Sequence, residues 1–220
     1  MFETNQLYPT QILHLFHQDC INEWRKRPTE TFKKGEHINY PEKLSDHIYL
    51  VTKGNARIFN IHTNGKECIL GIARECDFID LHSIFTEEPS SLYAMALTET
   101  SVVKIKKEEI MKQVMHTPEL SLALLRHFAT KLNDMTTVLE QIAYEKVEER
   151  LLRTLYKLSE KTSEKHGFYP LPSFLTHKDL AGMVASTRET ITFLLNKLIQ
   201  NDVIRQDEKQ LWIQKNLSFM

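Results

Sequence analysis

The sequence predicts an α+β chain with an N-terminal β-roll, a long dimerisation helix and a C-terminal winged helix-turn-helix. Three observations lead to this prediction. Short apolar runs separated by turn residues fill residues 32–105, a heptad pattern comes next, and two helical patterns flank a short turn within residues 175–204. We expect domain limits of 1–116 for the β-roll, 117–145 for the dimerisation helix and hinge, and 146–220 for the winged helix-turn-helix.

Composition and cysteine usage exclude several classes of protein. Hydrophobic residues make up 41% of the chain and charged residues 26%, as in soluble globular proteins. No apolar run reaches the length of a membrane span and the N-terminus lacks a signal-peptide pattern, so we expect a cytoplasmic protein without membrane contact. No metal site and no catalytic residues are expected, since the histidines show no ligand spacing and the three cysteines are Cys20, Cys68 and Cys76.

Four alternating or apolar runs predict strands in the first part of the chain: 46–52, 56–62, 67–73 and 101–105. Asn64-Gly65 lies between two of these runs and predicts a type I′ hairpin turn, because both residue types accept a positive φ. Several short strands with regular turns favour a β-roll. Before the strands, residues 7–25 predict a short helix with three inward residues, Leu13, Phe16 and Trp24.

A long helix is predicted to start at Pro118, with Thr117 as its cap and Glu119 near the positive end of its dipole. Along it, apolar residues alternate three and four apart over about three heptads. They are Leu125, Phe128, Leu132, Met135, Leu139 and Ile142. A helix that packs only on its own domain usually has a broader apolar face. The pattern therefore favours a parallel coiled-coil homodimer over packing within the chain, although one flank could also pack on the β-roll.

Residues 175–204 predict two helices joined by a tight turn. Thr176 can cap the first helix with Asp179 as its capping-box partner, and Thr187 can cap the second. The buried side of the second helix is predicted to hold Ile191, Leu194, Leu195 and Leu198. Its outward residues are then Arg188, Glu189, Thr192 and Asn196, with Lys197 beside them. In a major groove an Arg can pair with guanine and a Glu can accept from cytosine, whereas an ordinary helical hairpin would leave these side chains in solvent.

Two further features support contact with DNA. Residues 202–206 and 210–214 predict a β-hairpin wing, which commonly contacts phosphates. Residues 146–220 hold 12 Lys and Arg against 9 Asp and Glu, whereas residues 1–145 hold 16 against 20. The basic excess therefore lies on the segment with the helix-turn-helix, as phosphate contact requires. Residues 146–161 predict another amphipathic helix, and 165–172 predict a loop.

Four short motifs carry a resemblance to a known family: Tyr49-Leu50-Val51-Thr52-Lys53-Gly54, Asn64-Gly65-Lys66-Glu67, Asp77-Phe78-Ile79 and Thr187-Arg188-Glu189-Thr190-Ile191. With the order of the three parts, they resemble the CRP/FNR superfamily of bacterial transcription regulators over nearly the whole chain. The resemblance implies a cyclic-nucleotide-binding-like double-stranded jelly roll and a regulator, of activator type, that binds a pseudo-palindromic double-stranded DNA site as a homodimer. RNA polymerase is then the expected further partner.

The resemblance also implies roles for residues of the second helix. Arg188 and Glu189 would read bases, and Thr187 and Thr190 would bond phosphates. Phe193 departs from the Arg commonly found there, so a third base-reading donor is lost. The full set of expected DNA-binding residues is Thr176, His177, Lys178, Thr187, Arg188, Glu189, Thr190, Thr192, Asn196 and Lys197.

The effector region departs further from the cyclic-AMP-binding members. There a Glu accepts from the ribose hydroxyl and an Arg neutralises the cyclic phosphate. Leu81 and Ser91 stand at these places, so cyclic AMP is not expected, because a buried phosphate without a cation is costly. The expected effector pocket consists of Phe78, Ile79, Asp80, Leu81, His82, Ser83, Ser91, Leu92, Met135 and Thr136.

His82-Ser83 is similar to the haem-binding, gas-sensing branch of the family, where a His at this place ligates iron. That branch carries a Cys two residues earlier, where this chain has Asp80, and a ligating N-terminal Pro that this chain lacks. No cofactor is therefore expected, with haem as the alternative. Two interpretations stay beside an effector-sensing regulator: a regulator active without any ligand, and a β-barrel enzyme with an accessory winged domain.

Overall fold

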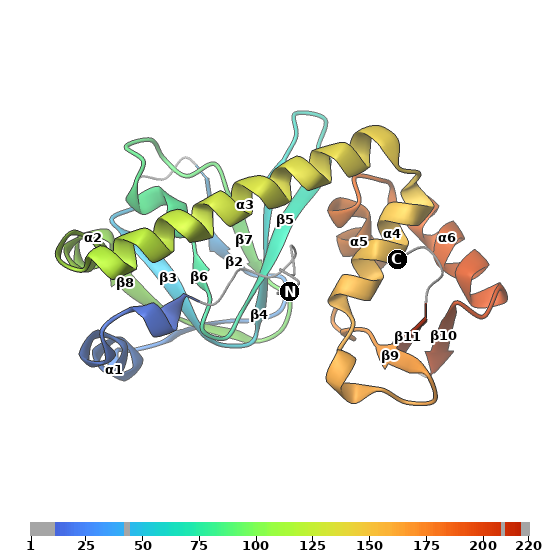
Figure 1. Ribbon diagram of the computed structural model, residues 1–220, viewed down its shortest axis with the longest axis horizontal. Helices are drawn as coiled ribbons and strands as arrows, with labels where there is room; N and C mark the ends of the chain where they lie inside the picture. Colours follow the sequence, from blue (N-terminus) through green and yellow to red (C-terminus); the bar gives the residue numbers. More distant parts are fainter. Residues whose placement is uncertain (1–11, 42–44, 208–209, 217–220) are drawn as a thin grey trace. The chain divides into compact units, whose positions relative to one another are not determined.

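The computed structural model describes residues 12–41, 45–207 and 210–216 and divides the chain into two compact units, Met1–Thr136 and Thr137–Met220 (Figure 1). The observed architecture is α+β, as the sequence predicted. Each unit has its own β-sheet structure and its own buried residues, so each is described by itself. The division into three parts remains a prediction.

Two four-stranded antiparallel sheets form the β-roll of the first unit, in the orders β1-β8-β3-β6 and β2-β7-β4-β5. Their strands are β1 Glu30–Phe32, β2 His37–Asn39, β3 His47–Lys53, β4 Asn55–Ile61, β5 Glu67–Arg74, β6 Phe78–Ile79, β7 Tyr93–Ala96 and β8 Thr100–Lys106. Small and branched residues from both sheets form one core: Ile38, Val51, Ala56, Ala73, Ile79, Ala94, Ala96 and Val102. The four predicted strands are β3, β4, β5 and β8.

A second core lies where helices cover the β-roll. It joins aromatic and aliphatic residues of the N-terminal segment to α2 (Lys107–His116) and to the start of α3 (Pro118–Tyr144). The predicted helix over 7–25 is wrong as one element. Its described part is a 3-10 turn, η1 (Leu13–Leu15), followed by α1 (Gln18–Lys26), because His17 is extended and caps α1 by accepting from the Asp19 amide. The predicted inward residues are buried: Leu13, Phe16 and Trp24.

The hairpin between β4 and β5 differs from the predicted type I′ turn. Gly65 has a φ of 79°, but Asn64 does not take the positive φ that a type I′ turn requires. The Gly65 amide donates to the His62 carbonyl at 2.8 Å, and the His62 amide donates to the Lys66 carbonyl at 2.9 Å. The loop is therefore longer than two residues, and only its glycine has to be left-handed.

The long helix α3 spans 27 residues, Pro118–Tyr144, and begins at the predicted proline. Leu120 and Leu124 in its first turns are buried against the β-roll. The rest of its apolar row is considered with the site below. Among the described residues, no helix is long and apolar enough to cross a membrane.

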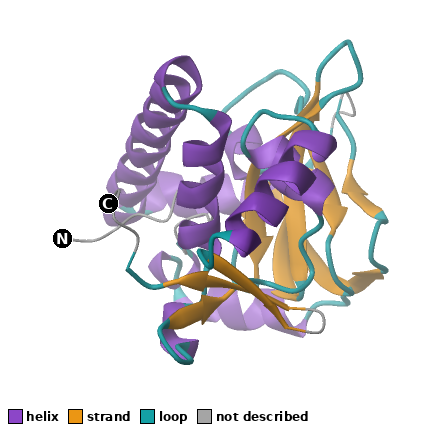
Figure 2. Ribbon diagram, turned by 90° about the vertical axis from the view of Figure 1, so that its right-hand side faces the viewer, coloured by secondary structure: helices purple, strands orange, loops and turns teal. Residues whose placement is uncertain are grey.

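The second unit is a winged helix-turn-helix (Figure 2). Its elements are α4 Val147–Leu158, η3 Lys161–Ser163, β9 Phe168–Pro170, α5 His177–Met183, α6 Arg188–Gln200, β10 Ile204–Asp207 and β11 Gln210–Gln214. The predicted wing is confirmed as the β10–β11 hairpin. The segment predicted as a loop over 165–172 contains a third strand, β9, which pairs with β11. Three residues that include a proline are too few to show an alternating pattern.

Candidate nucleic-acid interface

The first helix of the helix-turn-helix starts at a complete capping box. The Thr176 hydroxyl accepts from the Asp179 amide at 3.2 Å, and the Thr176 amide donates to the Asp179 carboxylate at 2.9 Å. The Thr176 hydroxyl also donates to the same carboxylate at 2.6 Å. Asp179 is 3% exposed, and its carboxylate serves the cap of α5 and does not face solvent. The predicted cap is confirmed, and it fixes where α5 begins.

The turn and the second helix also follow the sequence prediction. Ala185 takes a φ of 52°, and the Ser186 amide donates to the Ala181 carbonyl at 3.0 Å, which closes the turn. Thr187 caps α6 by accepting from the Thr190 amide at 3.2 Å. The four residues predicted to face inward are buried: Ile191, Leu194, Leu195 and Leu198. This apolar row fixes which face of α6 is turned to solvent.

The outward face of α6, here called the reading face, consists of Arg188, Glu189, Phe193 and Asn196, all of which are exposed. The pKa of Glu189 is lowered because its carboxylate accepts from its own backbone amide and from the Thr187 hydroxyl. The carboxylate is therefore ionised at neutral pH and can only accept hydrogen bonds. A charged donor in Arg188 and an acceptor in Glu189 stand side by side at the start of the helix.

Five further predicted contact residues have partners within the protein. His177 Nδ1 lies 2.9 Å from Thr192 Oγ1, and that hydroxyl donates to the Arg188 carbonyl at 2.9 Å. The Lys197 ammonium donates to both oxygens of Glu148 on α4, at 2.7 and 2.9 Å. Thr187 Oγ1 and Thr190 Oγ1 lie 3.0 Å apart at the cap. For these side chains, contact with DNA stays a prediction and would compete with the bonds they already make.

Arg150 holds the helix-turn-helix in place and was not identified from the sequence. This residue of α4 is 9% exposed. Its Nε donates to the Val184 carbonyl at the end of α5 (3.1 Å), and its Nη1 donates to the Glu145 carbonyl at the end of α3 (2.7 Å). The guanidinium thus satisfies two carbonyls that helix ends leave free. Arg150 adjoins the buried row of α4, and only the fold reveals its two partners.

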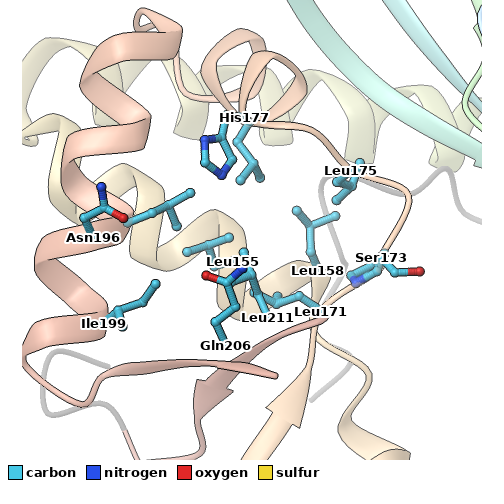
Figure 3. A pocket seen from close by; sticks show the side chains of 13 residues that line it. Leu155, Leu158, Leu171, Ser173, Leu175, His177, Asn196, Ile199, Gln206 and Leu211 are labelled. Carbon is cyan, nitrogen blue, oxygen red and sulfur yellow. The ribbon is translucent and has the colours of Figure 1, made fainter. Parts of the chain in front are cut away.

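A small cavity of about 200 Å³ lies beside the reading face, within the second unit (Figure 3). Leucines of α4, β11 and the segment before α5 line it, together with polar side chains from His177, Asn196 and Gln206. Pockets for small molecules usually hold roughly 300–1,000 Å³. The cavity is smaller than that, and no ligand is assigned to it.

The predicted effector residues of the β-roll are largely buried. Phe78, Ile79, Leu81 and Ser83 lie in the interior, whereas Ser91 is exposed and Leu92 is half-buried. Asp80 is 6% exposed, and its Oδ1 accepts from the Ser90 hydroxyl at 2.7 Å. The ten predicted residues include no Lys or Arg. A carboxylate without a cation in this segment is unfavourable for a bound phosphate.

The α3 residues of the predicted pocket point elsewhere. Met135 is 55% exposed, and the Thr136 hydroxyl donates to the Leu132 carbonyl of its own helix at 3.1 Å. A cavity of about 570 Å³ in the first unit lies instead between η2 (Leu81–Ile84), α2 and α3. It is lined by His82, Phe85, Thr86, Val114, Ser121, Leu124, Leu125 and Phe128. Residues 82–86 meet residues 114–128 there only after folding, so no motif could reveal the cavity.

Three ionisable groups of the first unit have pKa values that are shifted by burial. Asp77 is 2% exposed, and burial raises its pKa to about 6 although its Oδ2 accepts from the Arg74 amide at 2.8 Å. Burial also lowers the pKa of Lys131 and of His127 on α3. Within the described part of the chain, no group of three His, Cys, Asp or Glu side chains could hold a metal ion.

Most of the predicted dimer seam on α3 is unpartnered in the single chain. Leu125, Leu132 and Leu139 are 65–68% exposed, and Met135 and Ile142 are 55% and 44% exposed. Phe128 is partly buried, and its ring meets Phe85 edge-on at 5.7 Å. One flank of the seam therefore packs on the β-roll while the rest faces solvent. Apolar side chains in one continuous row on a helix mark a surface for association.

Comparison with known protein families matches both units. The model of the family described as cyclic nucleotide-binding domain matches residues 29–117, and that of the Crp-like helix-turn-helix domain matches residues 149–217. The two matches follow the same order along the chain as the β-roll and the winged unit.

Relatives with both units are found among characterised proteins. The Cyclic AMP receptor protein of Thermus thermophilus is 25% identical over 174 residues, covering 79% of this chain and 78% of the relative. The Global nitrogen regulator of Synechococcus elongatus is 24% identical over 192 residues, covering 84% of each chain. Among solved structures, the c-di-GMP-responsive global regulator CLP of Xanthomonas campestris shares the fold, with a TM-score of 0.75, 20% identity and coverage of 91% and 100%.

Proposed function

The chain belongs to the CRP/FNR superfamily of transcription regulators, and we propose that it binds a pseudo-palindromic DNA site as a homodimer without using cyclic AMP as its effector. The reading face of α6 carries this proposal. Arg188 offers a bidentate donor for guanine and Glu189 an ionised acceptor for the cytosine amino group. Both are exposed at the start of a capped, rigidly packed helix.

The exposed seam of α3 supports the homodimer. A continuous row that includes Leu125, Leu132 and Leu139 would be buried by the same row of a second chain, as in a parallel coiled coil. Two-fold symmetry of the protein then requires two related half-sites, one helical turn apart. As a regulator of transcription, the protein would work in the cytoplasm with RNA polymerase as a further partner, and we propose no catalytic activity.

The relatives differ in the signals that their names state. The relatives named above are a cyclic AMP receptor protein, a nitrogen regulator and a c-di-GMP-responsive regulator, so one fold serves different signals. In this chain Leu81 replaces the acceptor and Ser91 the cation that cyclic AMP needs. Asp80 adds a buried carboxylate. We therefore propose that the effector is a ligand other than cyclic AMP, or that the protein acts without an effector.

A second candidate function, a haem-based gas sensor, is favoured by one observation. His82 lines the apolar cavity of about 570 Å³, and its Nδ1 lies 3.5 Å from Asp80 Oδ1. A carboxylate behind a histidine orients the ring and strengthens the other nitrogen as a metal ligand. We expect protein produced with haem available to show no Soret band. A Soret band that disappears in His82→Ala would favour the haem sensor.

Binding to selected DNA tests the main proposal. Selection from random duplexes should yield a pseudo-palindrome, and Arg188→Ala should bind duplexes that differ only at the guanine contacted by Arg188 with nearly equal affinity. Each lost base contact should cost about 1–3 kcal/mol at its own base pair. Lys178→Ala, on the exposed flank of α5, serves as the matched control, since loss of a phosphate contact should weaken binding to all duplexes alike. Retained discrimination at every base pair in Arg188→Ala would contradict the assignment.

A further inference from the structure

Phe193 is an exposed aromatic residue in the middle of the reading face. Its side chain is 68% exposed, although the apolar residues around it on α6 are buried. It lies four residues after Glu189 and three before Asn196, and residues at these spacings share one face of a helix. On the face of α6 that is proposed to enter the major groove, a large apolar side chain would meet base edges instead of solvent, so its partner is sought among the apolar groups of the bases.

The major groove offers one apolar group at base edges, the C5 methyl of thymine. A phenyl ring has no donor for the acceptors of guanine and no acceptor for the amino group of cytosine. Apolar contact with a thymine methyl is, however, an observed mode of base recognition by Phe. The ring at position 193 can therefore distinguish bases by the methyl group alone.

The helix also sets where that thymine lies. Four residues of α-helix advance about 6 Å along its axis, and base pairs stack about 3.4 Å apart. The contact of Phe193 is then displaced by one or two base pairs from that of Glu189, within the same half-site. Both side chains lie within the first two turns of α6, which begins at Arg188.

We propose that Phe193 reads a thymine in each half-site through contact of its ring with the C5 methyl group. This inference rests on the proposed DNA-binding function and deepens it. It gives the half-site one position that is selected by a methyl group, in addition to those selected by the hydrogen bonds of Arg188 and Glu189.

Removing single methyl groups from the DNA tests the proposal. The preferred duplex of the unmodified protein is first obtained by selection, and each thymine is then replaced in turn by deoxyuridine, which lacks only the methyl group. One symmetry-related position per half-site should lose affinity, by about fourfold for each methyl group removed from contact. Cytosine at that position should bind more weakly than 5-methylcytosine, which presents the same methyl group.

Variants assign the effect to the side chain. Phe193→Ala should bind thymine and deoxyuridine duplexes equally, whereas Phe193→Leu should keep part of the difference. Arg188→Ala serves as the matched control, because it should lose guanine discrimination while retaining the methyl effect. A far-ultraviolet spectrum and melting temperature like those of the unmodified protein would show that the exposed substitutions leave the fold intact.

The outcomes separate two failures. A selected duplex whose affinity is unchanged by every deoxyuridine, or a methyl effect that persists in Phe193→Ala, would overturn the contact and leave the DNA-binding function standing. If no duplex is selected at all, the proposed function fails and the contact fails with it.

Discussion

Asp77 is a carboxylic acid in a place that disfavours its charge. Burial raises its pKa from the ordinary 3.8 to about 6. Between these values the folded protein holds a proton that the unfolded chain has released. The stability contributed by Asp77 is therefore fully present below about pH 4 and is lost as the pH rises through 6. The difference in pKa corresponds to roughly 3 kcal/mol at most.

Asp77→Asn should remove this pH dependence, because the amide oxygen can still accept from the Arg74 amide without carrying a charge. Relative to the unmodified protein, the free energy of unfolding of the variant should rise by roughly 1–3 kcal/mol between pH 4 and pH 7. Denaturant titrations at several pH values measure it. Glu88→Gln, at an exposed position, is the control and should show no such trend. A constant difference between Asp77→Asn and the unmodified protein across this range would contradict the raised pKa.

Single residues also mark how far the sequence could predict the site. The caps Thr176 and Thr187 follow from capping rules, and the outward Arg188, Glu189 and Asn196 follow from helical spacing, both of which are local rules. Thr192 was also predicted to face outward but is half-buried, and exposed Phe193 was not in the predicted outward set. The partners of Lys197 and Arg150 were not predictable. Glu148 and Val184 lie 49 and 34 residues away from them along the chain. A charge that is free in the sequence pattern becomes paired through the fold.

The element through which the proposed homodimer would form is α3. Leu132 is 65% exposed in the single chain and lies in the middle of the apolar seam. In a coiled-coil dimer, Leu132→Glu would place two carboxylates against each other in an apolar layer, where neither can be solvated or paired. Sedimentation should show monomers. The affinity for the selected duplex should fall at least about tenfold, which corresponds to a loss of about 1.4 kcal/mol in binding free energy.

Arg126→Glu supplies the matched control for this prediction. It introduces the same carboxylate on the same helix at an exposed position outside the seam. This variant should remain dimeric and bind DNA like the unmodified protein. A Leu132→Glu protein that stays dimeric with unchanged DNA affinity would show that the chains associate through another surface.

Among the strands of the first unit, length separates those that could be predicted from those that could not. Strands β3, β4, β5 and β8 have seven or eight residues and show clear patterns. Strands β1, β2, β6 and β7 have two to four residues, and their pairing depends on neighbours far along the chain. So short a run carries no periodicity. Helices with a proline or a threonine at their start were predicted closely for the same local reasons.

In the whole molecule, the predicted effector region and the proposed DNA-binding face lie in different units, and α3 runs from one unit into the other. Arg150 links the end of α3 to the end of α5 through two carbonyls, so a change at the junction of α3 and α4 reaches the helix-turn-helix directly. Such a link can couple two arrangements of the chain to one another. The cavity beside His82 was not foreseen, because residues of η2, α2 and α3 meet there only after folding.

Cyclic AMP should neither bind measurably nor change the affinity for the selected duplex. The reason is the missing acceptor and cation at Leu81 and Ser91, together with the carboxylate of Asp80, which is 6% exposed. Calorimetric titration measures the binding, and a DNA titration with and without the nucleotide measures the coupling. The double variant Leu81→Glu with Ser91→Arg restores both groups and should gain affinity for the nucleotide. Micromolar binding of cyclic AMP to the unmodified protein would show that its phosphate finds a cation outside the predicted pocket.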